Sequence, residues 1–137
     1  MSNAPHSSRF PLLSAGIAGL SGIALGAFGA HGLKAMLLER GMVQAWETAA
    51  RYHLFHALAL LGVAAWLQAG AAASGGRLAL WAARCWVAGT VIFSGSLYWL
   101  ALGGPRWLGP VTPFGGVALM AGWLLIAIAA CAKRPQP

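Results

Sequence analysis

Four long stretches without a charged side chain constrain this chain more than any other feature of its sequence. They are Phe10–Leu33, Tyr52–Gly76, Cys85–Pro105 and Trp107–Ala132. Each is longer than the about 20 residues that a helix needs to cross the hydrocarbon core of a bilayer. The sequence therefore predicts an all-α integral membrane protein, with four transmembrane helices in a compact bundle and a single membrane domain over residues 1–137. The expected spans are 11–31, 52–69, 79–101 and 111–132.

The composition supports this class of protein and argues against a nucleic-acid-binding protein. Hydrophobic residues make up 59% of the chain and charged residues only 8%, whereas soluble domains carry roughly 25% charged residues. The formal net charge of +7 comes from basic residues that are scattered singly between apolar stretches. Scattered charges build no continuous basic stripe. We therefore expect the lipid bilayer, and no nucleic acid, as the partner of this chain.

The basic residues also predict how the helices are oriented. With four spans, one side of the membrane carries five of the nine Lys and Arg residues, namely Arg9, Arg77, Arg84, Lys133 and Arg134. The other side carries Lys34, Arg40, Arg51 and Arg106 together with both acidic residues, Glu39 and Glu47. Because Lys and Arg clusters near span ends favour the cytoplasmic side, we expect both termini to be cytoplasmic.

Small residues mark one face of the first span. Ala18, Gly22, Gly26 and Ala30 recur every fourth residue and therefore lie near one another on a helix. Small side chains let a second helix approach closely, which is how helices associate in lipid. The row predicts a helix-packing face. A cleaved signal peptide is the alternative for this segment, although its apolar run is about twice as long as is usual for one.

Residues 33–50 separate the first two spans and are too charged to cross the membrane. Leu33, Met36 and Leu37 share one face of the first half, and Val43, Trp46 and Ala50 fall together in the second half. This pattern predicts a short interfacial amphipathic helical segment that lies on the bilayer and turns down into the second span. An irregular loop is the alternative.

Polar residues from several segments are expected in the outer half of the bundle. Glu47 and Arg51 stand one helical turn apart at the start of the second span, as an ion pair would. Because consecutive helices alternate in direction, other polar positions reach the same depth, and polar residues at membrane depth usually face a bundle interior or a wet cavity. We therefore predict an outward-opening polar pocket. Its candidate residues are His31, Glu47, Arg51, His53, His56, Ser94, Ser96, Tyr98 and Thr112.

The sequence assigns this pocket no catalytic residue, no metal and no cofactor. A metal site needs three or four ligands, and Cys85 and Cys131 are expected on the opposite side of the membrane. The spacing of His53 and His56 is a weak signal alone, and no Ser–His–carboxylate set or phosphate-binding loop is apparent. The alternative role of the two histidines is structural, through hydrogen bonds to Tyr98, Ser94 or lipid head groups.

Four motifs in order connect this chain to a known family. They are GAFGAHGL, WETAARYHLFHALALL, FSGSLYWLALGG and TPFGGVALMAGW. From about Gly16 to Trp123 they resemble the domain-of-unknown-function family four-two-three, small multi-span proteins of bacterial membranes with mitochondrial relatives. The resemblance implies a compact helical protein of the bacterial inner membrane. It brings no established activity and no catalytic residues.

Three functions remain open from the sequence. The favoured one is a non-enzymatic bundle that binds a lipid or small solute in the outer pocket, or that assembles with itself or with a membrane partner protein. The second is a subunit of an oligomeric transporter or channel, although no acid lies within a span to couple proton movement. The third is a membrane protein that holds haem or a metal through its histidines.

Overall fold

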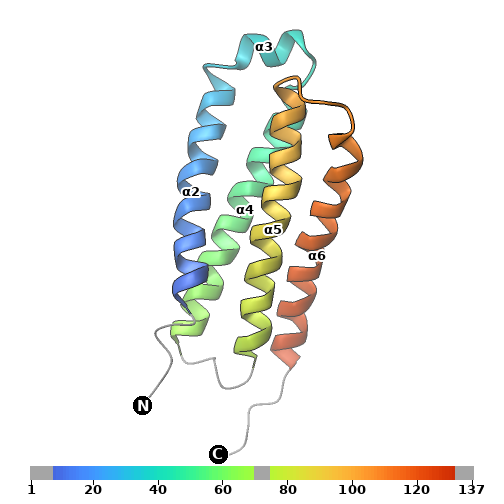
Figure 1. Cartoon of the computed structure of the whole chain (residues 1–137). Coiled ribbons are helices and arrows are strands. Elements are labelled where there is room, and N and C mark those ends of the chain that lie inside the picture. Colours follow the sequence, from blue (N-terminus) through green and yellow to red (C-terminus); the bar gives the residue numbers. More distant parts are fainter. Residues whose placement is uncertain (1–7, 70–74, 132–137) are drawn as a thin grey trace, which may run out of the picture.

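The computed structural model describes residues 8–69 and 75–131, and within these ranges the chain is helical, with no strand. The helices are listed here in chain order: α2 (Arg9–Ala30), α3 (Lys34–Glu39), α4 (Val43–Gln68), α5 (Gly76–Ala101) and α6 (Leu108–Cys131). Four of them are long and run side by side, whereas the short α3 crosses one end of the bundle (Figure 1). The prediction of an all-α fold is confirmed.

The long helices pack in the order in which they occur along the chain. α2 packs against α4, and α5 packs against both α4 and α6, whereas α2 and α5 contact each other only slightly. Consecutive long helices run in opposite directions, so α2 begins and α6 ends at the same end of the bundle (Figure 1). Because α2 and α5 both pack against α4 but contact each other only slightly, a space lined by all three helices lies between them.

Three helices of the described chain are long and apolar enough to cross a membrane, namely α2, α5 and α6. The remaining expected span, 52–69, overlaps α4, which is 26 residues long and ends at Gln68, but α4 is not among these three helices. Glu47, Arg51, His53 and His56 lower the mean hydropathy of α4. The structure thus supports a helical membrane protein with three apolar helices.

The expected interfacial segment, 33–50, is divided between two helices. Its first half contains the short helix α3, as predicted, whereas its second half is the beginning of α4 and continues without a break to Gln68. Gly41 stands between them with a φ of 64°, a backbone conformation that glycine adopts at little cost. Trp46, Ala49 and Ala50 are buried. We attribute the direction of residues 43–50, which run along the bundle as the beginning of α4, to the burial of these side chains. A helix lying on the bilayer surface would not bury them.

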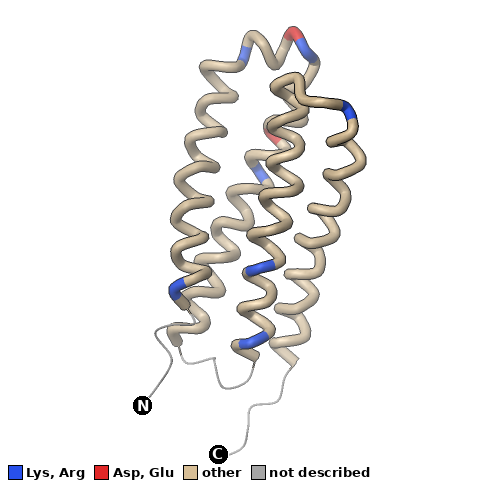
Figure 2. The backbone as a smooth tube through the Cα atoms, in the orientation of Figure 1, with Lys and Arg blue, Asp and Glu red and all other residues tan. Residues whose placement is uncertain are grey.

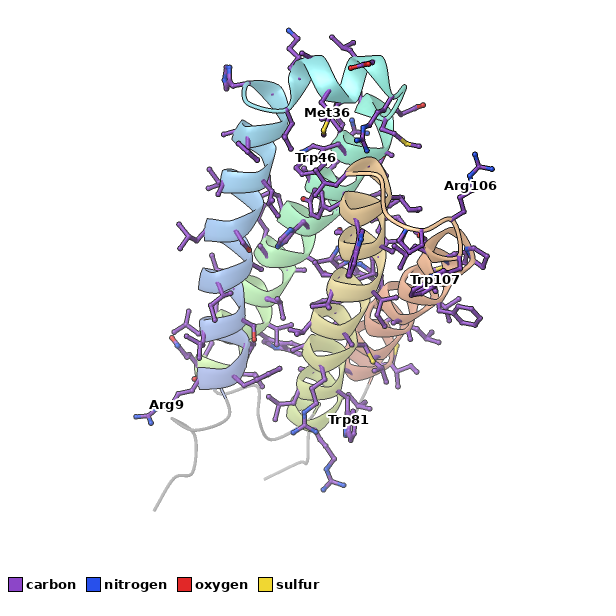
Figure 3. All side chains as sticks on the ribbon, turned by 45° about the horizontal axis from the view of Figure 1, so that its top comes forward. Arg9, Met36, Trp46, Trp81, Arg106 and Trp107 are labelled. Atoms are coloured by element: carbon purple, nitrogen blue, oxygen red, sulfur yellow. The ribbon has the colours of Figure 1, made fainter. Side chains whose placement is uncertain are left out.

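A cluster of buried side chains attaches α3 to the rest of the bundle. It contains Leu37 of α3, Trp46 of α4 and Tyr98 of α5. The rings of Trp46 and Tyr98 lie with their centroids 4.7 Å apart, and the Trp46 Nε1–H donates a hydrogen bond of 2.9 Å to the carbonyl oxygen of Leu25. Met36 and Trp46 lie at this end of the bundle, and Arg9 and Trp81 at the other (Figure 3). We call the end that carries α3 the α3 end.

A second and larger cluster lies mainly among α4, α5 and α6 and also includes Ala15 of α2. Trp86 is at its centre and is only 1% exposed. Its ring centroid lies 4.7 Å from that of Trp123 and 6.1 Å from that of His56. An added Cβ at Gly122 would fall on the Trp86 indole, so the small residue on α6 makes room for the large one on α5.

The contact face of α2 differs from the predicted row of small residues. A Cβ added at Gly22 would come within 2.8 Å of the Leu54 side chain, and one added at Gly29 would fall on the Trp46 indole. At Gly26, in contrast, an added Cβ would meet no described atom within 4 Å, Ala18 is only partly buried and Ala30 is exposed. The two close contacts are therefore seven residues apart. Positions four apart drift around the helix, whereas positions seven apart stay near one line.

Candidate functional site

The polar residues that were predicted to share one outer pocket are distributed over several places. His53, Ser94 and Tyr98 line a groove between α2, α4 and α5, whereas Glu47 and Arg51 line a cavity between α2, α3 and α4. The remaining members lie elsewhere, namely His31, His56, Ser96 and Thr112. The expectation of a single pocket assumed helices around one common axis. In the observed packing order, side chains at similar depth face different neighbours.

The groove between α2 and α5 has a volume of about 410 Å³, and α4 forms its floor. Ile17, Leu60, Val87 and Val91 make much of it apolar. Its polar lining comes from all three helices: Ser14, Ser21, His53, Thr90, Ser94 and Tyr98. We call this space the α2–α5 groove.

A chain of hydrogen bonds crosses the α2–α5 groove from α5 to α2. The Ser21 hydroxyl lies 2.7 Å from the carbonyl oxygen of Ile17 and 3.2 Å from the Nε2 of His53. The Nδ1 of His53 lies 3.5 Å from the Tyr98 hydroxyl, a length at which a hydrogen bond is weak. His53 thus stands between Ser21 of α2 and Tyr98 of α5.

His56 faces the opposite side of α4 and links it to α6. Its Nδ1–H donates to the carbonyl oxygen of Tyr52 at 2.7 Å, and its Nε2 accepts from the Trp123 Nε1–H at 3.2 Å. The side chain is buried and its ring centroid lies 6.2 Å from that of Trp123. Both ring nitrogens are thus occupied by protein groups. This geometry supports the structural alternative for His56.

Two further polar residues join α5 to α6. The hydroxyls of Ser96 and Thr112 lie 2.7 Å apart, and the backbone carbonyls of Phe93 and Leu108 lie within hydrogen-bond distance of one or the other. Ser94 donates to the carbonyl oxygen of Ala49 at 2.8 Å. These hydroxyls are therefore engaged within the protein. His31 follows the last residue of α2 and is exposed.

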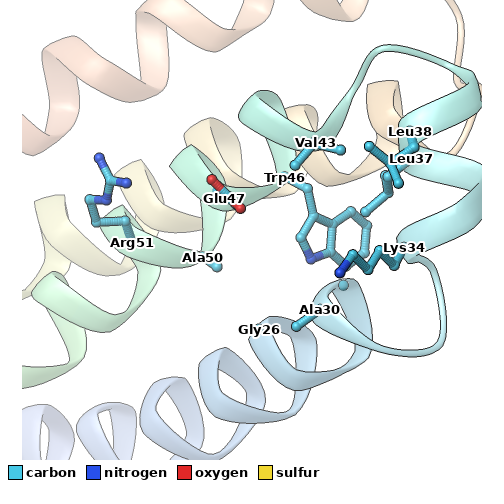
Figure 4. A pocket seen from close by; sticks show the side chains of 11 residues that line it. Gly26, Ala30, Lys34, Leu37, Leu38, Val43, Trp46, Glu47, Ala50 and Arg51 are labelled. Carbon is cyan, nitrogen blue, oxygen red and sulfur yellow. The ribbon is translucent and has the colours of Figure 1, made fainter.

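The second cavity lies at the α3 end of the bundle and has a volume of about 350 Å³. Buried Leu37 and Trp46 contribute apolar surface. Lys34, Glu47 and Arg51 bring charges of both signs to it (Figure 4). We call this space the α3 cavity. Within the described chain Glu47 and Arg51 do not form the expected ion pair, because their charged groups stand apart (Figure 4).

Sequence reasoning placed Glu47 and Arg51 in a candidate site but missed Lys34 and Trp46 beside them. Lys34 was assigned to the interfacial segment and Trp46 to its apolar face. The signal that could have joined them is the close spacing of Ala30, Lys34 and Leu37, which indicates a short turn from the end of α2 into α3. Across residues 8–69 and 75–131, no group of three or more His, Cys, Asp and Glu side chains is placed to hold a metal ion.

Comparisons with known proteins identify the family of this chain. A model of the family described as "Protein of unknown function (DUF423)" matches residues 25–116. The UPF0382 inner membrane protein YgdD of Escherichia coli (strain K12) is 43% identical over 128 residues, which cover 90% of this chain and 90% of that protein. The UPF0382 membrane protein YwdK of Bacillus subtilis (strain 168) is 40% identical over 111 residues, which cover 81% of this chain and 87% of that protein.

No solved structure matches this chain. The resemblance seen in the four sequence motifs is confirmed by the family match. The relatives are named as membrane proteins, in agreement with the three apolar helices. The chain therefore belongs to the DUF423 family of membrane proteins, whose function is unknown.

Proposed function

We propose that this protein is a non-enzymatic, four-span bundle that binds the head group of a phospholipid in the α3 cavity. The fourth span is α4, which lies alongside two apolar helices, α2 and α5. A bilayer that these two helices cross has to accommodate α4 as well, and its 26 residues exceed the about 20 that a span needs. The charged side chains of α4 lie in its first turns, where head groups can solvate them.

The charges support an orientation in which the α3 end faces away from the cytoplasm. Among the described residues, Arg9, Arg77 and Arg84 lie in the half of the bundle where α2 and α5 begin, whereas four basic residues lie toward the α3 end, namely Lys34, Arg40, Arg51 and Arg106 (Figure 2). Lys133 and Arg134 follow α6 in the sequence. By the positive-inside rule, both termini are then cytoplasmic. The inner membrane is the proposed location, since the Escherichia coli relative is named an inner membrane protein.

Reporter fusions test this orientation. Alkaline phosphatase fused at Gly41, between α3 and α4, should be active because the enzyme folds only outside the cytoplasm, whereas the same reporter fused after Pro137 should be inactive. A green fluorescent protein fused after Pro137 should fluoresce. Phosphatase activity at the C-terminus would contradict the proposed combination of four spans with both termini in the cytoplasm.

The observation that carries the head-group proposal is a set of charged side chains around the apolar α3 cavity that form no ion pair with another described residue. Lys34 and Arg51 are cations that bind phosphate oxygens, and Arg does so through paired N–H groups. Glu47 can accept hydrogen bonds from an ammonium group. Leu37 and Trp46 offer apolar surface to the glycerol and the first carbons of the acyl chains. This combination fits a phospholipid whose head group carries both a phosphate and a primary amine, as phosphatidylethanolamine does.

Native mass spectrometry with lipids retained tests the proposal. The wild-type protein, mixed with equal amounts of phosphatidylethanolamine, phosphatidylcholine and phosphatidylglycerol, should retain phosphatidylethanolamine preferentially. Glu47→Gln should remove the preference for the primary amine, and Lys34→Gln with Arg51→Gln should weaken retention of all three lipids. Because these side chains are solvent-exposed, we expect changes of about two- to fivefold, which correspond to roughly 0.4–1 kcal/mol.

Arg106→Gln is the matched control for the loss of one positive charge. Arg106 lies at the same end of the bundle and points away from it (Figure 3), and it does not line the α3 cavity. Its replacement should leave lipid retention unchanged. Equal retention of the three lipids by the wild type, or an Arg106→Gln effect as large as that of the double variant, would refute the head-group site.

A further inference from the structure

Two arginines and a tryptophan share one exposed face of α5, near the beginning of the helix. Arg77 and Arg84 are exposed, and Trp81, which lies between them in the sequence, is 51% exposed. Because the two arginines are seven residues apart, they lie nearly in line along the helix, and Trp81 is about one turn from each. We call these three residues the Arg–Trp–Arg face.

The side chain of Arg84 is directed back toward Arg77. Its Cζ lies 4.8 Å from the centroid of the Trp81 ring, which belongs to the preceding turn, and long side chains on helices generally lean toward the N-terminus in this way. A guanidinium group over the face of an indole is held there by a cation–π interaction. The contact therefore holds the charge of Arg84 nearer to the beginning of α5, and to Arg77, than its backbone position alone would.

The depth of Arg84 in a membrane gives a physical reason for this direction. α5 is one of the three described helices that are long and apolar enough to cross a membrane. The backbone of Arg84 stands about 10 Å farther along the helix axis than that of Arg77. A charge left at that depth is costly in hydrocarbon, whereas a side chain that turns toward the head groups keeps its charge in a polar layer. The Arg84 guanidinium therefore belongs at the level of the lipid head groups.

The acidic side chains of the chain are placed too far along the bundle to neutralise these two arginines. The sequence has two acidic residues, Glu39 at the end of α3 and Glu47 near the beginning of α4, and both lie toward the α3 end (Figure 2). Two guanidinium groups on one face repel each other, and an anion between them replaces repulsion by attraction. A phosphate group suits this role because guanidinium binds its oxygens through paired N–H groups.

We propose that the Arg–Trp–Arg face binds the phosphate of an anionic phospholipid. Arg77 and Arg84 contact the phosphate oxygens, and Trp81 lies against the glycerol and the first carbons of the acyl chains. The face offers two cations and no carboxylate, so it favours a head group without a positively charged amine, such as that of phosphatidylglycerol. The α3 cavity, in contrast, includes Glu47. This proposal rests on the membrane crossing of α5 and is independent of the head-group site.

Quenching of Trp81 by brominated lipids tests the proposal, because bromine quenches an indole only at short range. The full-length protein is reconstituted in phosphatidylcholine vesicles that contain a minor share of either brominated phosphatidylglycerol or brominated phosphatidylcholine. Each protein is measured beside its own Trp81→Phe counterpart, and the difference isolates the signal of Trp81 from that of lipid held in the α3 cavity. Phosphatidylglycerol should associate with the wild-type face about three- to fivefold more strongly than phosphatidylcholine.

Single substitutions separate the Arg–Trp–Arg face from a general attraction to anionic membranes. Arg84→Gln removes the charge held over Trp81 and should lower the preference for phosphatidylglycerol to less than about twofold, and Arg77→Gln should have a similar effect. Both side chains are exposed, so the thermal midpoints should stay near that of the wild type. Arg9→Gln is the matched control. Arg9 is an exposed arginine of α2 at the same end of the bundle (Figure 3), and its loss should leave the preference unchanged.

Three results would overturn the proposal. Equal association of the two lipids with the wild-type face would refute the site. An effect of Arg9→Gln as large as that of Arg84→Gln would attribute the preference to diffuse surface charge. An excess of soluble glycerol phosphate should leave the Trp81 signal unchanged, and competition by it would assign the face to a soluble phosphate ester in place of a lipid. Failure of the head-group experiment would leave these outcomes unaffected, because the Arg–Trp–Arg face contributes no residue to the α3 cavity.

Discussion

Gly115→Ala should lower the free energy of unfolding by about 3 kcal/mol, the upper part of the range for overpacked interiors. A Cβ added at Gly115 on α6 would stand 2.8 Å from the Cα of Phe93 on α5 and closer still to its backbone nitrogen. Backbone atoms cannot rotate away as a side chain would. The two helices must therefore separate along much of their shared surface to admit one methyl group. Thermal unfolding of the purified protein in mild detergent measures the loss.

The adjacent Gly116 provides the matched control. A Cβ added there would lie 3.8 Å from the Phe93 ring, an ordinary van der Waals contact. Gly116→Ala should therefore be neutral, or stabilising by up to about 1 kcal/mol through the higher helix propensity of alanine. Equal thermal midpoints for the two variants would show that α5 and α6 do not approach as closely as the structure indicates.

Trp86→Ala should have an effect of similar or greater size, about 3–5 kcal/mol, the usual cost of removing a large buried aromatic side chain. Trp86 is 1% exposed and packs against Trp123, His56 and the backbone of α6 at Gly122. In lipid the lost stability comes from van der Waals packing, because the hydrocarbon chains are as apolar as the side chain. The measurement is again thermal unfolding in the same detergent.

Two further substitutions make the Trp86 result interpretable. Trp107→Ala removes an indole that is 66% exposed and should change the midpoint little. Trp86→Phe should cost clearly less than Trp86→Ala, because the Trp86 Nε1 has no hydrogen-bond partner within the described chain and phenylalanine therefore loses ring area only. A Trp107 effect equal to that of Trp86 would indicate that the tryptophans act through the detergent.

The sequence predicted the helices better than it predicted their neighbours. Each uncharged run is long enough to form one long helix, and the described parts of the four expected spans overlap α2, α4, α5 and α6 to within one residue at their ends. The hydrophobic pattern was less informative at 43–50, where the apolar face of a helix lying on the bilayer and that of a buried first turn look alike. Trp46 on this face is buried beneath α3, and that contact depends on the turn at Gly41.

The site was harder to predict because depth alone does not determine which side chains meet. His53 and His56 are three residues apart, yet one is bonded toward α2 and the other toward α6. Their separation follows from the packing order of the helices, which no short motif encodes. The Oγ1 of Thr90 on α5 has no hydrogen-bond partner among the described residues. Its lack of a partner could be found only once the neighbouring helices were in place.

The packing order of the long helices also affects how the protein assembles. Each long helix makes its extensive contacts with the long helix before or after it in the chain. Few of the contacts therefore join segments that are far apart in the sequence. A low contact order of this kind is associated with fast folding. α2 and α4 can form a helical hairpin while the ribosome is still adding α5, and α6, which follows α5, can then complete the second hairpin. The packing order thus allows the helices to assemble in the order in which they are synthesised.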